Sequence, residues 1–221
     1  MPKQVDHVDV RELIPQGAGL GQLRDLARTC TGCELHRRGT QTVFGDGPRQ
    51  AEIMFVGEQP GDQEDRMGRP FVGPAGRLLH DALEQAGFRG SHYMTNVVKH
   101  FKWEPRGKRR IHKKPNMEEI TACRPWLDAE IDAVRPRALV CLGATAAQAL
   151  LGRSFRVTQH RGEPVDSPLA EIVTATVHPS SILRAPDERA RAEALAGFVA
   201  DLRWVTTELR DRDQQPQNRR E

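Results

Sequence analysis

The stretch Ile53–Gly76, IMFVGEQPGDQEDRMGRPFVGPAG, decides the fold of this chain. Its first four residues are apolar and predict a strand that is buried on both faces. Gly57-Glu58-Gln59-Pro60-Gly61 then ends that strand in a turn. In an open α/β sheet, ligands bind beyond the carboxyl ends of the strands, and glycine lets the backbone approach a ligand closely. Glu58 therefore stands where a functional residue is expected.

Acidic and aromatic side chains follow in the same predicted loop, namely Asp62, Glu64, Asp65 and then Phe71 between prolines and glycines. Two interpretations are open. The loop can be a solvated acidic segment with Phe71 filling the core, or it can offer carboxylates and one aromatic ring to a ligand. The position of Glu58 at the strand end favours Glu58 as the functional residue.

Predicted strands and helices alternate along the rest of the chain. After Ile53–Val56, the predicted strands are Tyr93–Val98, Ala138–Leu142 and Ile172–Val177, and the predicted helices are Leu20–Thr29, Pro74–Ala86, Met117–Val134, Ala144–Leu151 and Glu188–Leu209. This alternation predicts an α/β fold, a three-layer αβα sandwich with a mostly parallel central sheet of about four strands. We expect a flexible segment at 1–19, one domain over 20–209 and a disordered tail at 210–221.

Length and composition limit the possible classes of protein. A chain of 221 residues can bury a substantial core within one domain. No apolar run approaches the ~20 residues of a membrane span, and the first residues, MPKQVDHVDVRELIPQ, lack the apolar core of a secretory signal. We therefore expect a cytoplasmic protein with no membrane partner. The net charge is +3, but Lys99–Lys114 holds eight Lys or Arg and one acid, which predicts a polyanionic partner.

Three of the four cysteines form a candidate metal site. Cys30 and Cys33 make a C-x-x-C pair, which in a cytosolic chain is more often a metal or redox site than a disulfide. No predicted strand precedes the pair, which favours a metal over a thioredoxin-like site. Cys141 lies in an apolar strand, where a free cysteine is usually a small core residue. Cys123 then gives a third thiolate, one ligand short of a zinc or iron–sulfur site. His100 is the available fourth ligand, but a lone histidine is more often a surface or core residue than a ligand, so composition alone does not support this choice.

The basic segment Pro105–Lys114, PRGKRRIHKK, contains His112 among lysines and arginines. Neighbouring cations lower the pKa of a histidine and favour its neutral form. A neutral imidazole is a nucleophile or a base, whereas imidazolium is neither. The same cations would hold DNA phosphates. The alternative is a solvated charge run in which His112 is incidental.

Four segments in order, GEQPGDQEDRMGRPFVGPAG, TNVVKH, KRRIH and VHPSSIL, resemble the uracil-DNA glycosylase superfamily. The resemblance extends from about Cys30 to Trp204. In its family-four enzymes, a cluster is held by a C-x-x-C pair, a cysteine after the second strand and a cysteine in the following helix. The resemblance therefore implies a [4Fe–4S] cluster and excludes Cys141 from it. The implied ligands are Cys30, Cys33, Cys123 and, where the family has its remaining cysteine, His100.

Two departures from the family-four pattern resemble one branch of the superfamily, the UdgX type. They are Gln59 in the first motif and the inserted loop Lys108–His112. Members of the UdgX type become covalently attached to DNA at the site from which uracil was removed. The resemblance thus implies that the chain is a DNA repair hydrolase that excises uracil. It also implies that His112 becomes linked to C1′ of the resulting abasic site, which would allow only one turnover.

The resemblance implies a role for each site residue. Phe71 stacks on the flipped base, Asn96 bonds its Watson–Crick edge, and His178 donates to uracil O2 as charge develops there. Glu58 stabilises the cationic sugar or orients a nucleophile, and His112 captures C1′ in place of water. The implied substrate-binding residues, beside Phe71 and Asn96, are Gln59, Asp62, Ser180, Arg109 and Arg110.

The expected partners are uracil-containing DNA, single- or double-stranded, and free uracil as product. We expect a monomer in the bacterial cytosol, associated with the nucleoid. Two alternatives stay open. One is a conventional family-four glycosylase that releases an abasic site, with His112 only a DNA contact. The other is a non-catalytic protein that carries a cluster and recognises uracil in DNA. The state of the DNA after mixing distinguishes the three.

Overall fold

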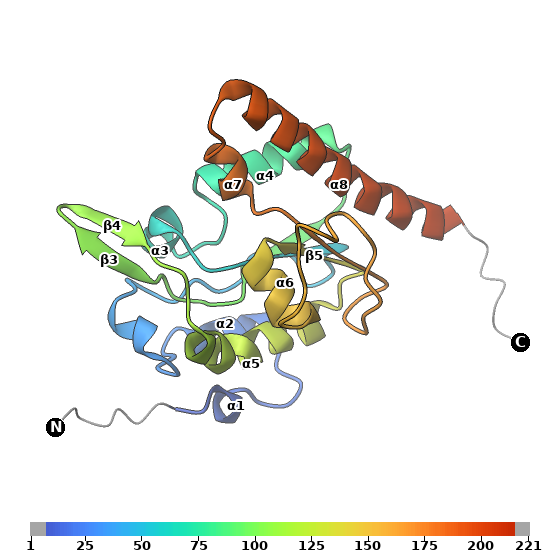
Figure 1. The fold of residues 1–221 in the computed structure, drawn as a ribbon. Helices are drawn as coiled ribbons and strands as arrows, with labels where there is room; N and C mark the ends of the chain where they lie inside the picture. The colour runs from blue at the N-terminus through green and yellow to red at the C-terminus, as the bar shows by residue number, and fades with distance from the viewer. Residues whose placement is uncertain (1–7, 215–221) are drawn as a thin grey trace, which may run out of the picture.

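Four parallel strands form the centre of the computed structural model, which describes residues 8–214 (Figure 1). They are β1 (Ile53–Gly57), β2 (His92–Asn96), β5 (Ala138–Leu142) and β6 (Ile172–Thr176). Their order across the sheet is β2-β1-β5-β6, and every neighbouring pair is parallel. Because parallel strands all point the same way, their four carboxyl ends lie along one edge of the sheet.

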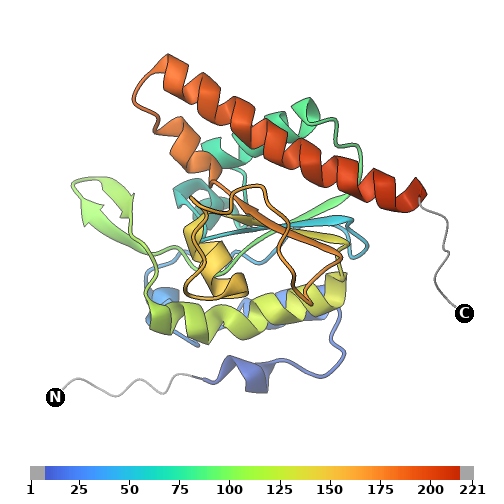
Figure 2. The same ribbon diagram turned by 45° about the vertical axis from the view of Figure 1, so that its right-hand side comes forward.

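Helices cover both faces of the sheet and give two cores (Figures 1 and 2). Met54 and Val56 of β1 belong to one core, whereas Ile53 and Phe55, which point the other way, belong to the other. The first core also takes residues of α1 (Val10–Leu13), α2 (Leu20–Ala27), α5 (Met117–Val134) and α6 (Ala144–Leu151). The second takes residues of α4 (Pro74–Gln85), α7 (Pro179–Leu183) and α8 (Glu188–Gln214). The predicted α/β fold is confirmed.

The predicted elements match closely where the sequence carries local signals. β5, α5 and α6 have the predicted bounds, and the other predicted strands and helices differ at their ends. Asn116 and Glu119 form a capping box at the start of α5: the Asn116 side chain accepts from the Glu119 N–H at 2.9 Å, and the Glu119 carboxylate accepts from the Asn116 N–H at 2.7 Å. Among the described residues, no helix is long and apolar enough to cross a membrane.

Five elements lie where the sequence suggested loops or flexible ends. The acidic loop contains α3 (Asp62–Met67), and the basic segment forms an antiparallel hairpin of β3 (Trp103–Arg106) and β4 (Arg109–His112). A short 3₁₀ helix covers Glu34–Arg37. The segment 1–19 contains α1, in which Val10 is buried. The remaining parts of the predicted flexible ends, 1–7 and 215–221, lie outside the described residues.

The last helix also extends further than predicted. The sequence placed a disordered tail from residue 210, but α8 continues to Gln214. Asp213, in this extension, forms an ion pair with Arg137 in which the atoms Oδ1 and Nη1 lie 2.7 Å apart. This contact joins the end of α8 to the residue just before β5, so it gives the extension a tertiary partner.

A buried ion pair joins the carboxyl end of β2 to α5. Lys99 and Glu130 are almost fully buried, and the Lys99 ammonium donates to the Glu130 carboxylate. Lys99 Nζ also donates to the Asn96 carbonyl oxygen at 2.7 Å. The Glu130 carboxylate has three further donors: the Gly45 N–H, the Tyr93 hydroxyl and the Thr95 hydroxyl. Because every group in this network has a partner, it fixes the chain around Asn96.

We predict that Glu130→Gln lowers the free energy of unfolding by ~3–5 kcal/mol, because it leaves the Lys99 ammonium buried without a counter-charge. Denaturant unfolding at neutral pH measures the change. The control is Glu193→Gln, because Glu193 pairs with Arg189 on an exposed part of α8, and such pairs contribute less than ~1 kcal/mol. Equal stability of the two variants would contradict the prediction.

Candidate active site at the carboxyl edge of the sheet

A cavity of about 750 Å³ opens at the carboxyl edge of the sheet. Each central strand delivers residues to it from the segment that follows, and the hairpin adds one more. The lining includes Glu58 and Gln59 after β1, Asn96 at the end of β2, Gly143 and Thr145 after β5, His178 and Ser180 after β6, and His112 of β4. This is the place where open α/β sheets bind ligands.

Gly57 allows two site residues to come close together. It lies opposite Asn96 in the β1–β2 register. A Cβ at this position would lie 2.4 Å from Asn96 Oδ1 and 2.8 Å from Phe71 Cζ, so a side chain larger than hydrogen would displace both. Phe71 itself has a left-handed backbone, with φ of 54°. The Asn96 amide and the Phe71 ring therefore share one part of the cavity wall.

His178 is held as a neutral hydrogen-bond donor. The Ser180 N–H donates to His178 Nδ1 at 3.1 Å, which assigns the ring proton to Nε2. Burial, with smaller effects of Arg184 and His112, lowers the pKa of His178 to about 4. The Phe71 ring stacks against the imidazole, with the ring centroids 6.3 Å apart. At neutral pH, Nε2–H is therefore available to an acceptor in the cavity.

Glu58 lies between two partners. The Thr145 hydroxyl donates to Glu58 Oε2, and His112 Nε2 lies 3.5 Å from Glu58 Oε1. Burial lowers the pKa of His112; the Glu58 charge opposes this effect and Arg184 adds to it. The sequence predicted a neutral His112 because of neighbouring cations in its own segment. The direction agrees, but the main cause is partial desolvation of the half-exposed His112 side chain, and Arg184 directly follows α7.

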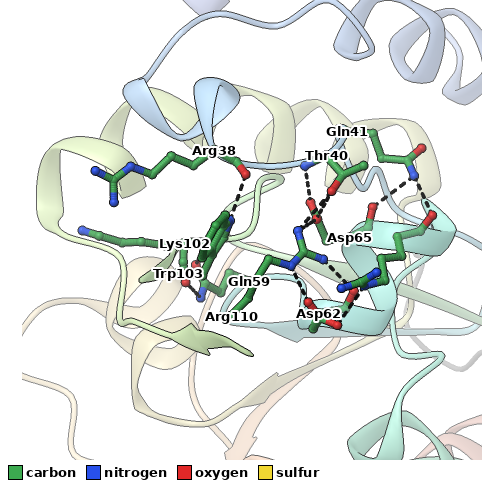
Figure 3. A network of polar contacts seen from close by, with 10 residues as sticks. Arg38, Thr40, Gln41, Gln59, Asp62, Asp65, Lys102, Trp103 and Arg110 are labelled. Atoms are coloured by element: carbon green, nitrogen blue, oxygen red, sulfur yellow. Dashed lines mark hydrogen bonds and ion pairs between the residues drawn. The ribbon is translucent and has the colours of Figure 1, made fainter. Parts of the chain in front are cut away.

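Gln59 fixes the two ends of the hairpin that carries His112. Figure 3 shows its contact with Lys102 at one of these ends. Its Nε2 donates to the Lys102 carbonyl oxygen at 3.2 Å and to the Lys113 carbonyl oxygen at 3.0 Å. Its Oε1 accepts from the Lys102 N–H at 3.0 Å. Lys102 directly precedes β3 and Lys113 directly follows β4. One side chain of the β1 turn thus holds the hairpin over the cavity.

Arg110 attaches the hairpin to α3 (Figure 3). Its guanidinium donates to the carboxylates of Asp62 and Asp65, the latter at 2.6 Å. The same group lies over the rings of Phe101 and Trp103, 5.4 and 5.5 Å from their centroids. Arg110 and Asp62 were both predicted to bind substrate, and here they bind each other. Arg109 lies in β4 outside the cavity lining, so contacts of either arginine with DNA stay predictions.

The three predicted catalytic residues, Glu58, His112 and His178, all line one cavity. Sequence reasoning missed Thr145 and Arg184. Thr145 had one signal, because it comes two residues after Gly143 at the end of β5, much as Glu58 follows Gly57 at the end of β1. Arg184 had no sequence signal beyond its position six residues after His178.

Comparison with known families decides the relationship. The family model described as the uracil DNA glycosylase superfamily matches residues 44–203, which include the whole cavity lining. This chain belongs to the uracil-DNA glycosylase superfamily. A type-4 uracil-DNA glycosylase of Thermotoga maritima is 42% identical over 159 residues, covering 71% of this chain and 79% of the relative.

Two other members of the superfamily are similar over more of the chain. A type-4 uracil-DNA glycosylase of Pyrobaculum aerophilum is 37% identical over 175 residues, 76% of this chain and 86% of the relative. One of Archaeoglobus fulgidus is 36% identical over 198 residues, 81% of this chain and 92% of the relative. The similarity therefore covers most of each protein.

This superfamily member also buries three cysteines together. Cys30, Cys33 and Cys123 are free thiols in the core beside α5. Burial raises the pKa of Cys33, and it raises that of Cys123 to about 12; the neighbouring cysteines add to both effects. Trp126 Nε1–H donates to Cys30 Sγ, and the Lys99 N–H donates to Cys123 Sγ, both at 3.2 Å. N–H donors to sulfur are typical around iron–sulfur ligands.

His100 and Cys141 make other contacts. His100 is buried, and its Nε2 lies 2.9 Å from the Thr42 hydroxyl. Cys141 is buried within β5, and burial raises its pKa to about 12. Within residues 8–214, no three Cys, His, Asp or Glu side chains are arranged to hold a metal ion. The three thiols fit the donor set of a cluster by their chemistry, and His100 as fourth ligand stays a prediction.

We predict that His178 stays neutral, with its proton on Nε2, as pH falls from 8 to about 5, because its lowered pKa postpones protonation to about pH 4. Nitrogen NMR of labelled histidine side chains distinguishes the tautomers and follows the titration. A Ser180→Pro variant lacks both the donating N–H and the Ser180 hydroxyl, which lies 2.8 Å from Nδ1, and should lose the preference for the Nε2–H form. Titration of His178 near the ordinary 6.5 would contradict the prediction.

Proposed function

We propose that this chain is a uracil-DNA glycosylase that excises uracil and then stays covalently bound, through His112 Nε2, to C1′ of the abasic sugar. Membership of the superfamily and the similarity to type-4 enzymes support the excision step. One observation carries the covalent step: His112 Nε2 lies 3.5 Å from Glu58 Oε1 within the cavity. Conventional enzymes would need only water at this position.

Binding begins when the target nucleotide rotates out of the base stack, at a cost of a few kcal/mol. The Phe71 ring offers a stacking surface to the base. The Asn96 amide offers one donor and one acceptor, which suits the O4 acceptor and N3–H donor of uracil. Cytosine presents the reverse pattern at these two positions, so a fixed orientation of the amide discriminates against it.

Excision breaks the bond between C1′ and uracil N1. The electron pair of this bond stays with the base, and part of its charge develops on O2. His178 donates from Nε2–H to that oxygen and so stabilises the leaving base. The sugar is left with positive charge at C1′, which the Glu58 carboxylate stabilises. Thr145, through its bond to Oε2, keeps the Glu58 carboxylate oriented.

Capture follows when the lone pair of His112 Nε2 forms a bond to C1′. The imidazolium so formed loses its Nδ1 proton to solvent, and the uracil anion takes up a proton at N1. No water is consumed, and the charges balance. The bonds from Gln59 to both ends of the hairpin hold His112 beside C1′, which favours imidazole over water as the nucleophile.

We predict that wild-type protein and a uracil-containing oligonucleotide form a complex that survives boiling in detergent, because a C–N bond does not depend on the fold. Oligonucleotides with thymine or cytosine in place of uracil should give none. His112→Gly should form no such complex and should instead release abasic sites repeatedly, since water can then reach C1′. Denaturing gel electrophoresis measures both products.

Two variants separate the possible failures of this prediction. Glu58→Gln should bind DNA and neither excise uracil nor form the complex, because the cationic sugar loses its counter-charge. Gln59→Ala should form less complex and more free abasic site, because the hairpin is no longer held. Full yield of the heat-stable complex with His112→Gly would reject His112 as the nucleophile.

We also propose that Cys30, Cys33 and Cys123 bind a [4Fe–4S] cluster with His100. The cluster would supply a structural link, because the first two thiols follow α2 whereas Cys123 belongs to α5. The N–H groups of Trp126 and Lys99 would then stabilise the thiolate sulfurs.

We predict that the purified protein carries iron and that Cys123→Ser loses it with a fall in melting temperature, because the two segments are no longer linked. Cys141→Ser should retain the iron. His100→Cys should retain it and His100→Ala should not. Metal analysis and thermal unfolding measure these effects. Stoichiometric zinc without iron would contradict the proposal.

A further inference from the structure

A second cavity, of about 510 Å³, lies at the opposite end of α3 from the active site. The active-site cavity is lined by Asp62, Gln63 and Glu64, the first residues of α3, whereas the second is lined by Met67, its last. Three guanidinium groups and one carboxylate line the second cavity: Arg24, Arg28, Arg69 and Asp46. The lining therefore has an excess of positive charge.

Asp46 orients two of these arginines. Its Oδ2 accepts from Arg69 Nε at 3.1 Å and from Arg69 Nη2 at 2.9 Å. Arg24 Nη2 lies 3.9 Å from Asp46 Oδ1 and donates to the Gly45 carbonyl oxygen at 3.2 Å. Asp46 is itself fixed by backbone hydrogen bonds to Met94 of β2. One carboxylate thus pre-arranges two guanidinium groups but balances only one charge.

We propose that this cavity binds the sugar–phosphate backbone of the DNA strand that carries the uracil. Guanidinium groups bind phosphate oxygens in a matched, often bidentate geometry. Met67, whose side chain is exposed, and Phe44 add apolar surface that suits a sugar or base beside the phosphate. The proposal rests on the proposed binding of uracil-containing DNA, and it assigns the strand a second contact outside the excision site.

The length of α3 sets the spacing between the two sites. Six residues at ~1.5 Å each span about 9 Å, and a stacked strand advances ~3.4 Å per nucleotide. The second site therefore lies about three nucleotides from the uracil. Arg110 fixes the α3 carboxylates, and Gln41 Nε2 donates to the carbonyl oxygens of Asp65 and Arg66 at 3.0 Å (Figure 3). Because α3 is held at both ends, this spacing is rigid.

The test is equilibrium binding of single strands that carry 2′-fluorodeoxyuridine, whose fluorine destabilises the sugar cation and so prevents excision. The strand is shortened one nucleotide at a time on either side of the uracil analogue. The affinity of the wild-type protein should fall abruptly when about the third nucleotide on one side of the analogue is removed. We call this fall the step. Arg28→Gln/Arg69→Gln should lack the step. Its plot of log affinity against log salt should be shallower by roughly 0.7 per lost phosphate contact.

Arg28 pairs with Asp25 and Arg69 with Asp46, and all four side chains are at least partly exposed. Arg189→Gln/Arg212→Gln is the matched control, because it likewise removes two exposed arginines that pair with carboxylates, here on α8. It should keep both the step and the wild-type salt slope. If the double variant is destabilised, as a lowered denaturant midpoint would show, the single variant Arg69→Gln replaces it. This variant should show a smaller step and part of the decrease in salt slope. A wild-type step and slope in both Arg69 variants would overturn the proposal.

Two further outcomes are separated by the design. The first is followed by also measuring the binding of a deoxynucleoside monophosphate. If the arginine variants lose this binding but keep the wild-type dependence on strand length, the cavity binds free nucleotides and the proposal is wrong. Formation of the heat-stable complex with the shortest uracil strand tests the proposed function by itself. Wild type and Arg28→Gln/Arg69→Gln should form it at equal rates, because that strand does not reach the second cavity.

Discussion

The close approach of β1 and β2 at their carboxyl ends is the constraint on which the site depends. Gly57 lies opposite Asn96, and there is no room between the strands for a Cβ beside the Asn96 amide and the Phe71 ring. The turn that follows then directs Glu58 into the cavity and Gln59 toward the hairpin. On the other side of Asn96, the buried Lys99–Glu130 pair holds its backbone. One pair of strands thus positions Glu58, Gln59 and Asn96, three of the residues to which the proposed function assigns a role.

The hairpin lies outside this framework, and its position depends on contacts with residues outside its two strands. Its strands are mostly exposed and pair only with each other, and an isolated two-stranded hairpin is marginally stable in water. Gln59 fixes its two ends and Arg110 attaches it to α3. These contacts bring His112 within 3.5 Å of the Glu58 carboxylate. A cavity that could use water thereby gains an imidazole beside its carboxylate, and this imidazole is the nucleophile in the function that we propose.

Sequence reasoning succeeded where the signal is local and failed where the contact is distant. The core strands and α5 follow from apolar runs and from the capping box at Asn116. The hairpin has no apolar alternation, and the long-range bonds that attach it, from Gln59 and Arg110, cannot be read from its local sequence. For α3, acids in the first turn and the left-handed Gly68 at its end were available as signals. Arg110 was assigned to DNA because a basic run does not disclose its carboxylate partners.

The identity of the atom that captures the sugar is the most direct test of this account. Wild-type protein is reacted with a uracil-containing oligonucleotide, the DNA is trimmed by nuclease, and the protein is digested and sequenced by mass spectrometry. The account predicts a deoxyribose remnant on the imidazole of His112 and on no other side chain. A remnant on Lys108, Lys113 or Lys114, or an abasic oligonucleotide with unmodified protein, would contradict it.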